Sequence, residues 1–334
     1  MATDRTAVTV PDVLRIGTRG SALALTQTNW VADRVRATGV AVDLEVITTR
    51  GDADQQGPVA TLGADGVFVR ELERALLERR IDAAVHSLKD LPTAETPGLV
   101  VACVPERALP FDVLIGRTAA TLDALPAGSV VGTSSVRRIV QVLALRPDLA
   151  VRPLRGNVDT RLRRLDAGDY DALVLAGAGL ERLGLRDRIT EVLRPDRFWP
   201  AVSQGALAVQ MRADDGRTSQ ALAALDHEAS HLAVCAERAC LAELAGGCLA
   251  PIGGWARVEP HRGLVLGACV FEERDGAVRR IDAEGSIPSG EGSGVSRRAA
   301  VELGRRVAAD LATRGALEML SRMRATASVH GPEA

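Results

Sequence analysis

The chain has 334 residues, with 41 lysine and arginine residues against 43 aspartate and glutamate residues, so its formal net charge is only −2. This balance and an aromatic content of 2% argue against a nucleic-acid-binding protein, which needs a basic field or aromatic side chains that stack on bases. A hydrophobic content of 46% is that of an ordinary soluble globular protein, and the length predicts two or three domains.

No apolar stretch approaches the roughly 20 residues that span a bilayer, and the first residues lack the pattern of a signal peptide. We therefore expect a cytoplasmic protein without membrane contact, and nothing in the chain demands more than a monomer. The cysteines are an odd number without C-x-x-C spacing, which argues against a disulfide framework and a structural zinc site, so we expect no metal. They are Cys103, Cys235, Cys240, Cys248 and Cys269.

The amino-terminal stretch predicts a strand, a turn of small residues and a helix. Residues 13–17 form the strand, and the helix runs from Ala22 to about Arg36 with Ser21 as its N-cap. Arg15 and Arg19 flank the turn, whose backbone N–H groups point at whatever occupies it. This arrangement predicts an anion-binding geometry.

The only lysine of the chain follows a predicted buried strand. Before it, residues 42–47 predict a strand that ends near Arg50, residues 53–66 a mobile loop and residues 68–76 a helix. The buried strand at residues 81–85 delivers residues 86–90 into a loop, at the sheet edge where open α/β sheets bind ligands. Lys89 stands beside Asp90 in this loop.

A second α/β unit repeats the order of strand, turn and helix. Residues 129–133 predict a strand, followed by capping residues and a helix with two arginines in its first turn: Thr133, Ser134, Ser135, Arg137 and Arg138. A strand at 149–154, a turn at 155–157 and a helix that carries Arg161 follow. The strand at 171–176 is expected to end in a loop at 177–179.

The remaining residues predict a small C-terminal α+β domain of antiparallel character. Residues 201–211 indicate a turn that leads into a strand, and residues 228–244 a helix. Strands at 264–271 and 279–285 are joined by a turn at 275–276, and apolar residues four apart from 295 to 311 predict a last helix.

Arginines recur where predicted strands end and helices begin. In a chain so rich in arginine any single one can fall at a turn by chance, but the joint pattern predicts a cleft between two α/β units that receives a ligand with several negative groups. The arginines in question are Arg15, Arg19, Arg50, Arg137, Arg138, Arg155 and Arg161.

Three other residues have both a chemical and a structural interpretation. Asp90 beside Lys89 suits proton transfer or the stabilisation of a developing cation, although a surface ion pair would give the same pattern. His86 can orient a ligand or simply hydrogen-bond within the fold. Cys248, in the loop Gly246–Pro251, has the surroundings of an accessible thiol that could act as a nucleophile or attachment point, whereas the other cysteines lie in apolar strands or a helix.

Seven motifs together resemble the porphobilinogen deaminase (hydroxymethylbilane synthase) family, in its order and spacing, from about Leu14 to the last helix. They are LRIGTRGSALAL, TTRGD, AVHSLKDLP, VGTSSVRR, LRGNVDTRL, PAVSQGALAV and GGCLAPIG. The resemblance implies two periplasmic-binding-protein-like α/β lobes and a small C-terminal α+β domain. The implied domains are residues 1–105 with 203–224, residues 106–202, and residues 225–334.

By the same resemblance, Cys248 holds a dipyrromethane cofactor through a thioether. Four porphobilinogen molecules are condensed on it head to tail with loss of ammonia, and hydrolysis releases hydroxymethylbilane. Asp90 corresponds to the family's catalytic aspartate, which interacts with pyrrole nitrogens and stabilises an azafulvenium-like cation.

The resemblance also implies a set of residues that bind the acetate and propionate groups of the cofactor and growing chain. The set is Arg15, Arg19, Ser21, Lys89, Thr133, Ser134, Ser135, Arg137, Arg138, Arg155, Gly156 and Arg161, with His86, Ser87 and Gln204 in support. The chain departs from the family at Thr61 and Asp65, where lysines are common, and at Gly20 and Ala22. The alternative from another class is a non-catalytic binding protein for a polycarboxylate or oxyanion.

Overall fold

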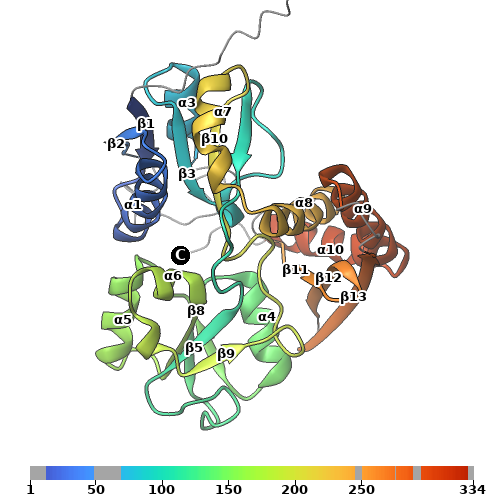
Figure 1. The fold of residues 1–334 in the computed structure, drawn as a ribbon. Coiled ribbons are helices and arrows are strands. Elements are labelled where there is room, and N and C mark those ends of the chain that lie inside the picture. Colours follow the sequence, from blue (N-terminus) through green and yellow to red (C-terminus); the bar gives the residue numbers. More distant parts are fainter. Residues whose placement is uncertain (1–12, 49–68, 245–249, 275, 289–294, 330–334) are drawn as a thin grey trace, which may run out of the picture. The chain divides into compact units, whose positions relative to one another are not determined.

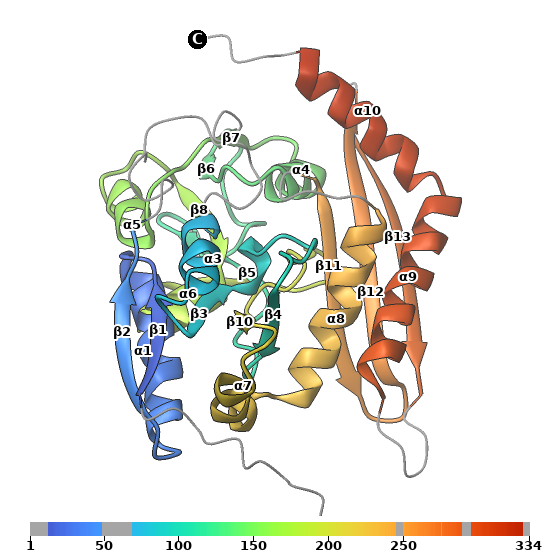
Figure 2. The ribbon, with the colours of Figure 1, turned by 90° about the horizontal axis from the view of Figure 1, so that it is seen from above.

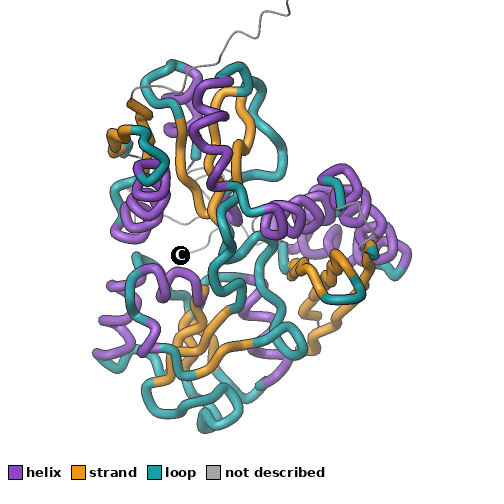
Figure 3. Tube along the Cα trace, in the orientation of Figure 1, coloured by secondary structure: helices purple, strands orange, loops and turns teal. Residues whose placement is uncertain are grey.

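The computed structural model describes residues 13–48, 69–244, 250–274, 276–288 and 295–329, with side chains described as far as residue 323. The chain divides into two compact units, one formed by Met1–Arg107 with Ala206–His231 and the other by Ala108–Gly205 with Leu232–Ala334. Figure 3 shows that both units contain helices and strands. The predicted three-domain boundaries stay a prediction.

The first unit contains a five-stranded mixed sheet in the order β2-β1-β3-β10-β4 (Figure 1). Its strands are β1 (Val13–Thr18), β2 (Ala41–Val46), β3 (Ala83–Ser87), β4 (Leu99–Cys103) and β10 (Leu207–Arg212). β1 pairs in parallel with both β2 and β3, whereas β10 is antiparallel to β3 and β4. The strands β1 and β3 therefore end at the same edge of the sheet.

Helices cover both faces of this sheet because side chains alternate along each strand. The helix α1 (Ala22–Arg36) packs Val31 and Val35 against Ala83 and Val85. The helix α3 (Arg70–Leu77) packs against Ala84 on the other face. Short helices α7 (Gly216–Leu222) and η4 (Ala223–Leu225) follow β10.

The second unit contains a sheet in the order β7-β6-β8-β5-β9. Its strands are β5 (Asp112–Gly116), β6 (Val130–Gly132), β7 (Ala150–Arg152), β8 (Ala172–Ala176) and β9 (Glu191–Leu193). The strands β6, β7 and β8 are parallel, and β5 is antiparallel to β8 and β9. The helices α4 (Val136–Leu145), α5 (Val158–Asp166) and α6 (Gly177–Arg182) each begin where a parallel strand ends; η3 (Arg186–Arg188) follows.

The loop predicted at residues 177–179 is wrong, because these residues begin the helix α6. A Cβ on Gly177 would lie 2.5 Å from Leu109 Cδ2 and 3.0 Å from Val113 Cγ1. This glycine therefore serves close packing rather than a turn, a distinction that a single sequence does not reveal.

A three-stranded antiparallel sheet in the order β11-β12-β13 completes the second unit. It consists of β11 (Ile252–Glu259), β12 (Gly263–Arg274) and β13 (Ala277–Ile287), flanked by α8 (Glu228–Glu243), α9 (Arg297–Thr313) and α10 (Ala316–Val329) (Figure 2). The three helices share one apolar core with the sheet. No helix in the described part of the chain is long and apolar enough to cross a membrane.

The opposite face of this sheet packs on α4, where Val140 meets Cys269 and Phe271. This contact explains why the C-terminal sheet and the second α/β sheet belong to one compact unit. The predicted fold class, two α/β lobes and a small C-terminal α+β domain, is confirmed.

A buried carboxylate ties α8 to two other segments of the second unit. Glu237 is 0% exposed and accepts hydrogen bonds from the backbone N–H groups of Ser203, at 2.5 Å, and Ala256, at 2.7 Å. Ser203 has a φ of 61°, a conformation that non-glycine residues rarely adopt without such support.

We expect Glu237→Ala to lower the free energy of unfolding by about 2 to 6 kcal/mol, because two buried N–H groups lose their acceptor. Chemical denaturation followed by circular dichroism measures the change. The control is Glu243→Ala on the same helix, whose exposed pair with Arg305 is expected to contribute less than about 1 kcal/mol. Equal losses in the two variants would contradict this role of Glu237.

Candidate active site

The first unit gathers several predicted site residues where β1 and β3 end. The register of the two strands pairs Ile16 with Ala83 and Gly17 with Ala84, so the residues that follow, Arg19 and His86, lie near each other. The chain then turns into the 3-10 helix η2 (Leu88–Asp90), which carries Lys89 and Asp90. Arg19, His86, Lys89 and Asp90 therefore share one edge of the sheet.

Asp90 is exposed, and its position is set by buried neighbours. Leu88 and Leu91 are 1% and 6% exposed, and the Leu88 N–H donates to the carbonyl of Ala206 at 3.0 Å. Lys89 is half-buried. The short helix thus holds a solvent-accessible carboxylate on an anchored backbone.

The loop predicted from His86 is wrong for two residues, because β3 continues through Ser87, which pairs with Leu207 of β10. The Ser87 hydroxyl accepts a hydrogen bond from Gln27 Nε2 of α1 at 3.0 Å. Ser21 caps α1 as predicted, since its Oγ accepts from the Ala24 N–H at 3.3 Å. Ser87 thereby links α1 to the strand that leads to Asp90, whereas Ser21 fixes the start of the helix.

His86 is 5% exposed, and its Nε2 has no hydrogen-bond partner among the described residues. Burial lowers the pKa of His86 to about 4, and the positive charge of Arg19 acts in the same direction. The imidazole is therefore neutral at physiological pH. His86 therefore places a polar but uncharged side chain in β3, directly before the helix that carries Asp90.

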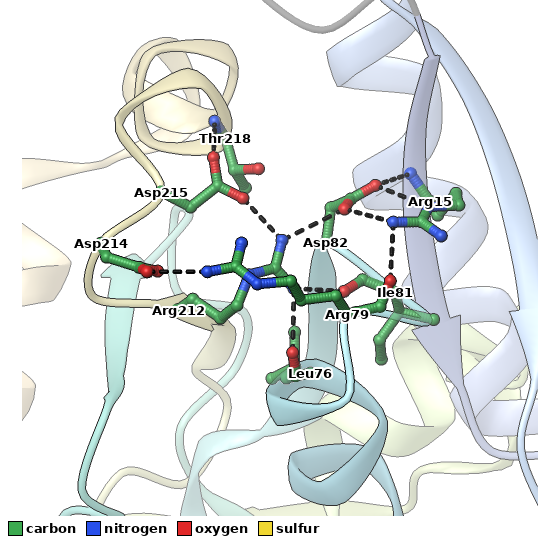
Figure 4. Close-up of polar contacts among 9 residues, drawn as sticks. All are labelled: Arg15, Leu76, Arg79, Ile81, Asp82, Arg212, Asp214, Asp215 and Thr218. Atoms are coloured by element: carbon green, nitrogen blue, oxygen red, sulfur yellow. Dashed lines mark hydrogen bonds and ion pairs between the residues drawn. The ribbon is translucent and has the colours of Figure 1, made fainter.

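Arg15 does not lie with these residues. It stands about 13 Å before Arg19 along β1, four residues at the usual strand rise. Its guanidinium donates to both carboxylate oxygens of Asp82, at 3.0 and 2.8 Å, and to the carbonyl of Arg79 (Figure 4). Asp82 also pairs with Arg212 at 3.2 Å.

This network at the amino end of β3 is balanced in charge. Arg212 is 5% exposed and also donates to Asp215 at 2.6 Å, while Asp215 caps α7 through the Thr218 N–H (Figure 4). Burial alone would raise the pKa of Asp82, but its hydrogen bonds and ion pair with Arg15 outweigh burial and hold the pKa below its ordinary value. The structure places Arg15 in this network rather than beside Asp90.

The second unit brings its predicted residues to one sheet edge. The strands β6 and β7 lead into α4 and α5, and the Ser134 hydroxyl links them by donating to the Leu154 carbonyl and accepting from the Leu154 N–H, both at 2.9 Å. Thr133 is buried and accepts from the Ser135 N–H. Neither Ser135 nor Asn157 caps its helix through a side chain.

The turn at Arg155 and Gly156 follows β7 as predicted. Gly156 has a φ of 99°, and a Cβ there would lie 2.9 Å from Thr160 Cγ2, so the position requires glycine. Arg161 Nε donates to the Gly156 carbonyl at 2.7 Å. Arg161 is thereby anchored beside Arg155 at the start of α5.

Two buried arginines share one buried carboxylate at the same edge. Arg137 and Arg138 are 5% and 7% exposed, and each pairs with the fully buried Asp112 at 2.7 Å. Gln204 Nε2 donates to Asp112 at 3.0 Å and to the Pro110 carbonyl. Burial opposes ionisation of Asp112, yet the charges and hydrogen bonds of the two arginines hold its pKa well below the usual range.

Two partly buried cations, Arg161 and Arg182, lack a comparable acidic partner among the residues described. Burial lowers the pKa of Arg161 to about 10, assisted by the charge of Arg138. Burial also lowers the pKa of Arg182 to about 10, although Glu181 partly opposes the shift. Arg182 donates to the Gly205 carbonyl at 2.7 Å.

Sequence reasoning missed Asp112 and Arg182. Asp112 opens an apolar strand, where an acidic residue is unexpected and could have been noted as the partner of a buried cation. Arg182 was missed because the sequence predicts a loop at residues 177–179 and no helix, which gives Arg182 no defined position. Arg50, Thr61, Asp65 and Cys248 lie outside the described residues.

These observations define an α/β protein with arginines gathered at the carboxyl ends of its parallel strands and an exposed carboxylate suited to acid–base chemistry. Residues 14–220 match the family model described as porphobilinogen deaminase, dipyrromethane cofactor binding domain. Residues 231–313 match the model of the porphobilinogen deaminase C-terminal domain. The chain belongs to the porphobilinogen deaminase family.

Relatives agree with this assignment over nearly the whole chain. The porphobilinogen deaminase of Thermus thermophilus is 47% identical over 314 residues, which cover 93% of this chain and 99% of the relative. That of Roseiflexus sp. is 48% identical over 283 residues, covering 84% and 93%. The enzyme is thus a porphobilinogen deaminase (hydroxymethylbilane synthase) with a dipyrromethane cofactor-binding domain, an activity of tetrapyrrole biosynthesis.

Solved structures of binding proteins are similar only at a low level. The methionine-binding protein MetQ has a TM-score of 0.43 and 15% identity, over 64% of this chain and 90% of that chain. A periplasmic substrate-binding protein from Coxiella burnetii has a TM-score of 0.42 and 19% identity, over 64% and 91%. Similarity at this level says nothing about the ligand.

We expect the burial of His86 to make the protein acid-sensitive between pH 6.5 and 4. In the unfolded chain this histidine takes up a proton near pH 6.5, but in the folded protein only near pH 4, so the free energy of unfolding falls as the pH drops through this window. The loss is about 3 kcal/mol at pH 4, and no contribution remains above pH 6.5.

Urea denaturation at several pH values measures this slope in the wild type and in His86→Gln, which should lack it. His261→Asn is the control, since His261 is exposed and its φ of 67° is one that asparagine tolerates. A wild-type slope that persists in His86→Gln would show that other groups cause the acid sensitivity.

Proposed function

We propose that the enzyme condenses four porphobilinogen molecules head to tail on a dipyrromethane attached to Cys248. Each addition forms one carbon–carbon bond and releases one ammonia, and hydrolysis then releases hydroxymethylbilane. The proposal is supported above all by a local excess of positive charge in the second unit, where the buried Arg137 and Arg138 share the carboxylate of Asp112.

The excess charge suits a ligand with several carboxylates. The single charge of Asp112 balances only one of the two arginines that it contacts. The positive charge of Arg138 also lowers the pKa of Arg161, so these guanidinium groups repel each other. Buried ions cost several kcal/mol each unless they are paired, so the folded site is stabilised by an added anion. Arginine binds carboxylates through two parallel N–H bonds, and each pyrrole brings an acetate and a propionate.

Several residues of the second unit would hold the carboxylates of the dipyrromethane. Arg137, Arg138, Arg155 and Arg161 supply cations, and Thr133, Ser134, Ser135 and Gly156 shape the turns that present them. When bound, the cofactor supplies the pyrrole carbon to which each new unit is joined. In the first unit, carboxylates would be held by Arg19, Ser21 and Lys89. Arg15 would have a structural role instead, through its pair with Asp82.

Asp90 is proposed as the catalytic residue. Its carboxylate is exposed on an anchored 3-10 helix, so it can approach a pyrrole nitrogen without first breaking a buried contact. There it would hold the N–H proton and stabilise positive charge that develops as ammonia departs. The neutral His86 and the nearby Ser87 would support the strand that carries it.

The chemistry of the described cysteines supports attachment at Cys248. Burial raises the pKa of Cys103 and Cys240 to about 12, and it raises the pKa of Cys269 as well. The thiolate is the nucleophilic form, so these three thiols are protected from alkylation. Cys235 is half-buried against the core of α8.

Membership of the family argues against the alternative of a non-catalytic binding protein. We also propose that the enzyme acts as a monomer in the cytoplasm, with porphobilinogen as its substrate and without nucleic acid or membrane as a partner. The near-neutral charge of the chain is consistent with this assignment.

Intact-protein mass spectrometry tests the attachment. The purified wild type should exceed its sequence mass by one dipyrromethane group, and Cys248→Ser should not. Cys235→Ser is the matched control and should keep the added mass. An unmodified wild type with full activity would rule out the covalent cofactor.

We expect Asp90→Asn to keep the fold and the cofactor mass but to lose at least about 100-fold in kcat, the usual effect of removing an acid–base group. Steady-state assays of porphobilinogen consumption measure the loss. Glu95→Gln, at an exposed residue five positions later, should retain normal turnover. Normal turnover in Asp90→Asn would remove Asp90 from the mechanism.

A further inference from the structure

Trp199 connects the C-terminal sheet to the buried arginines of the second unit. Its backbone is held by α4: the Trp199 N–H donates to Gln141 Oε1 at 2.6 Å, and the Trp199 carbonyl accepts from Gln141 Nε2 at 3.1 Å. The same carbonyl accepts a hydrogen bond from Arg137 Nη1, the nitrogen that also pairs with Asp112. Trp199 therefore supplies one of the two acceptors that orient this guanidinium nitrogen.

The side chain of Trp199 occupies a notch formed by two glycines on neighbouring strands. A Cβ on Gly253 of β11 would lie 2.5 Å from Trp199 Cβ, and a Cβ on Gly267 of β12 would lie 2.6 Å from Trp199 Cη2. The register pairs Gly253 with Cys269 and Trp255 with Gly267, so both glycines lie on the face that packs against α4. We call Gly253 and Gly267 the glycine notch.

Shape rather than hydrogen bonding holds the indole there. Trp199 Nε1 is buried and has no hydrogen-bond partner among the described residues, which costs about 1 to 3 kcal/mol. Contact with the notch is the interaction that offsets this cost. Any shift of the C-terminal sheet is thereby transmitted to the backbone of Trp199.

We propose that Trp199 is a positioning residue that couples the seating of the C-terminal sheet to the orientation of Arg137. The proposal rests on the proposed role of Arg137 in binding ligand carboxylates. A guanidinium recognises a carboxylate through the direction of its N–H bonds, so small displacements of the Trp199 carbonyl change the affinity for the ligand. β11, which carries half of the notch, begins four residues after Cys248, so the segment proposed to carry the cofactor and the arginine proposed to bind it are tied together.

A double-mutant cycle in the holoenzyme tests this coupling. Gly267→Ala places a methyl group against the indole and forces it to move. We expect the KM for porphobilinogen to rise about three- to tenfold, with less than a twofold change in kcat, because the disturbed contact acts in binding. Trp199→Leu should raise KM as well, and adding Gly267→Ala to Trp199→Leu should change KM no further, since the methyl group then meets no indole.

Gly254→Ala is the matched control. It adds the same methyl group to β11, but its nearest neighbour would be Val202 Cγ2 at 3.1 Å, and Trp199 is not among its contacts. Its KM should equal that of the wild type. A smaller stability loss in the double variant than the sum of the single losses would confirm that Gly267 and Trp199 touch.

Two outcomes would overturn the proposal. In the first, Gly267→Ala raises KM by the same factor in the wild type and in Trp199→Leu. In the second, Gly267→Ala lowers the stability of the enzyme without changing KM. The variant Arg137→Gln distinguishes an error in the role of Trp199 from an error in the proposed carboxylate-binding role of Arg137. If Arg137→Gln leaves KM unchanged, the carboxylate-binding role of Arg137 is wrong and the coupling has no consequence for the ligand. If it raises KM while the cycle is additive, only the role of Trp199 is wrong.

Discussion

The second unit of this enzyme depends on the buried ion pairs that the carboxylate of Asp112 makes with Arg137 and Arg138. Without it, Arg137 and Arg138 would place two like charges side by side in the interior, at a cost of several kcal/mol each. With it, both guanidinium groups are oriented, and among the described residues the two arginines share one carboxylate. The local excess of positive charge is where we propose that the carboxylates of the cofactor bind.

The network around Asp82 shows the contrasting case. It is built from the same residue types, but Arg15 and Arg212 are matched by Asp82 and Asp215, so the charges cancel. It lies at the amino end of β3, away from Asp90, where it joins β1, β3, β10 and α7. The balance of charge, more than the presence of arginine, distinguishes this structural network from the site that we propose for the ligand.

Glycines also serve a structural role that local sequence hides. Gly177 allows α6 to approach Leu109, and Gly253 and Gly267 receive Trp199. In each case the missing Cβ permits contact between distant segments instead of permitting a turn. The contacts of Trp199 and Val140 with the C-terminal sheet make it one compact unit with the second α/β sheet.

The sequence by itself determined the fold class, the family and many of the strands and helices, though not α6, because helix periodicity, capping residues such as Ser21 and seven short motifs are local signals. It also predicted that arginines collect where strands end. Only the tertiary structure decided which arginines do so. Arg15 lies within β1 and joins Asp82 before the start of β3, whereas Arg19, just after the end of β1, lies near His86 towards the end of β3. Asp112 and Arg182 escaped prediction for the same reason, since the partner of a buried charge is chosen by strand pairing between residues far apart in the chain.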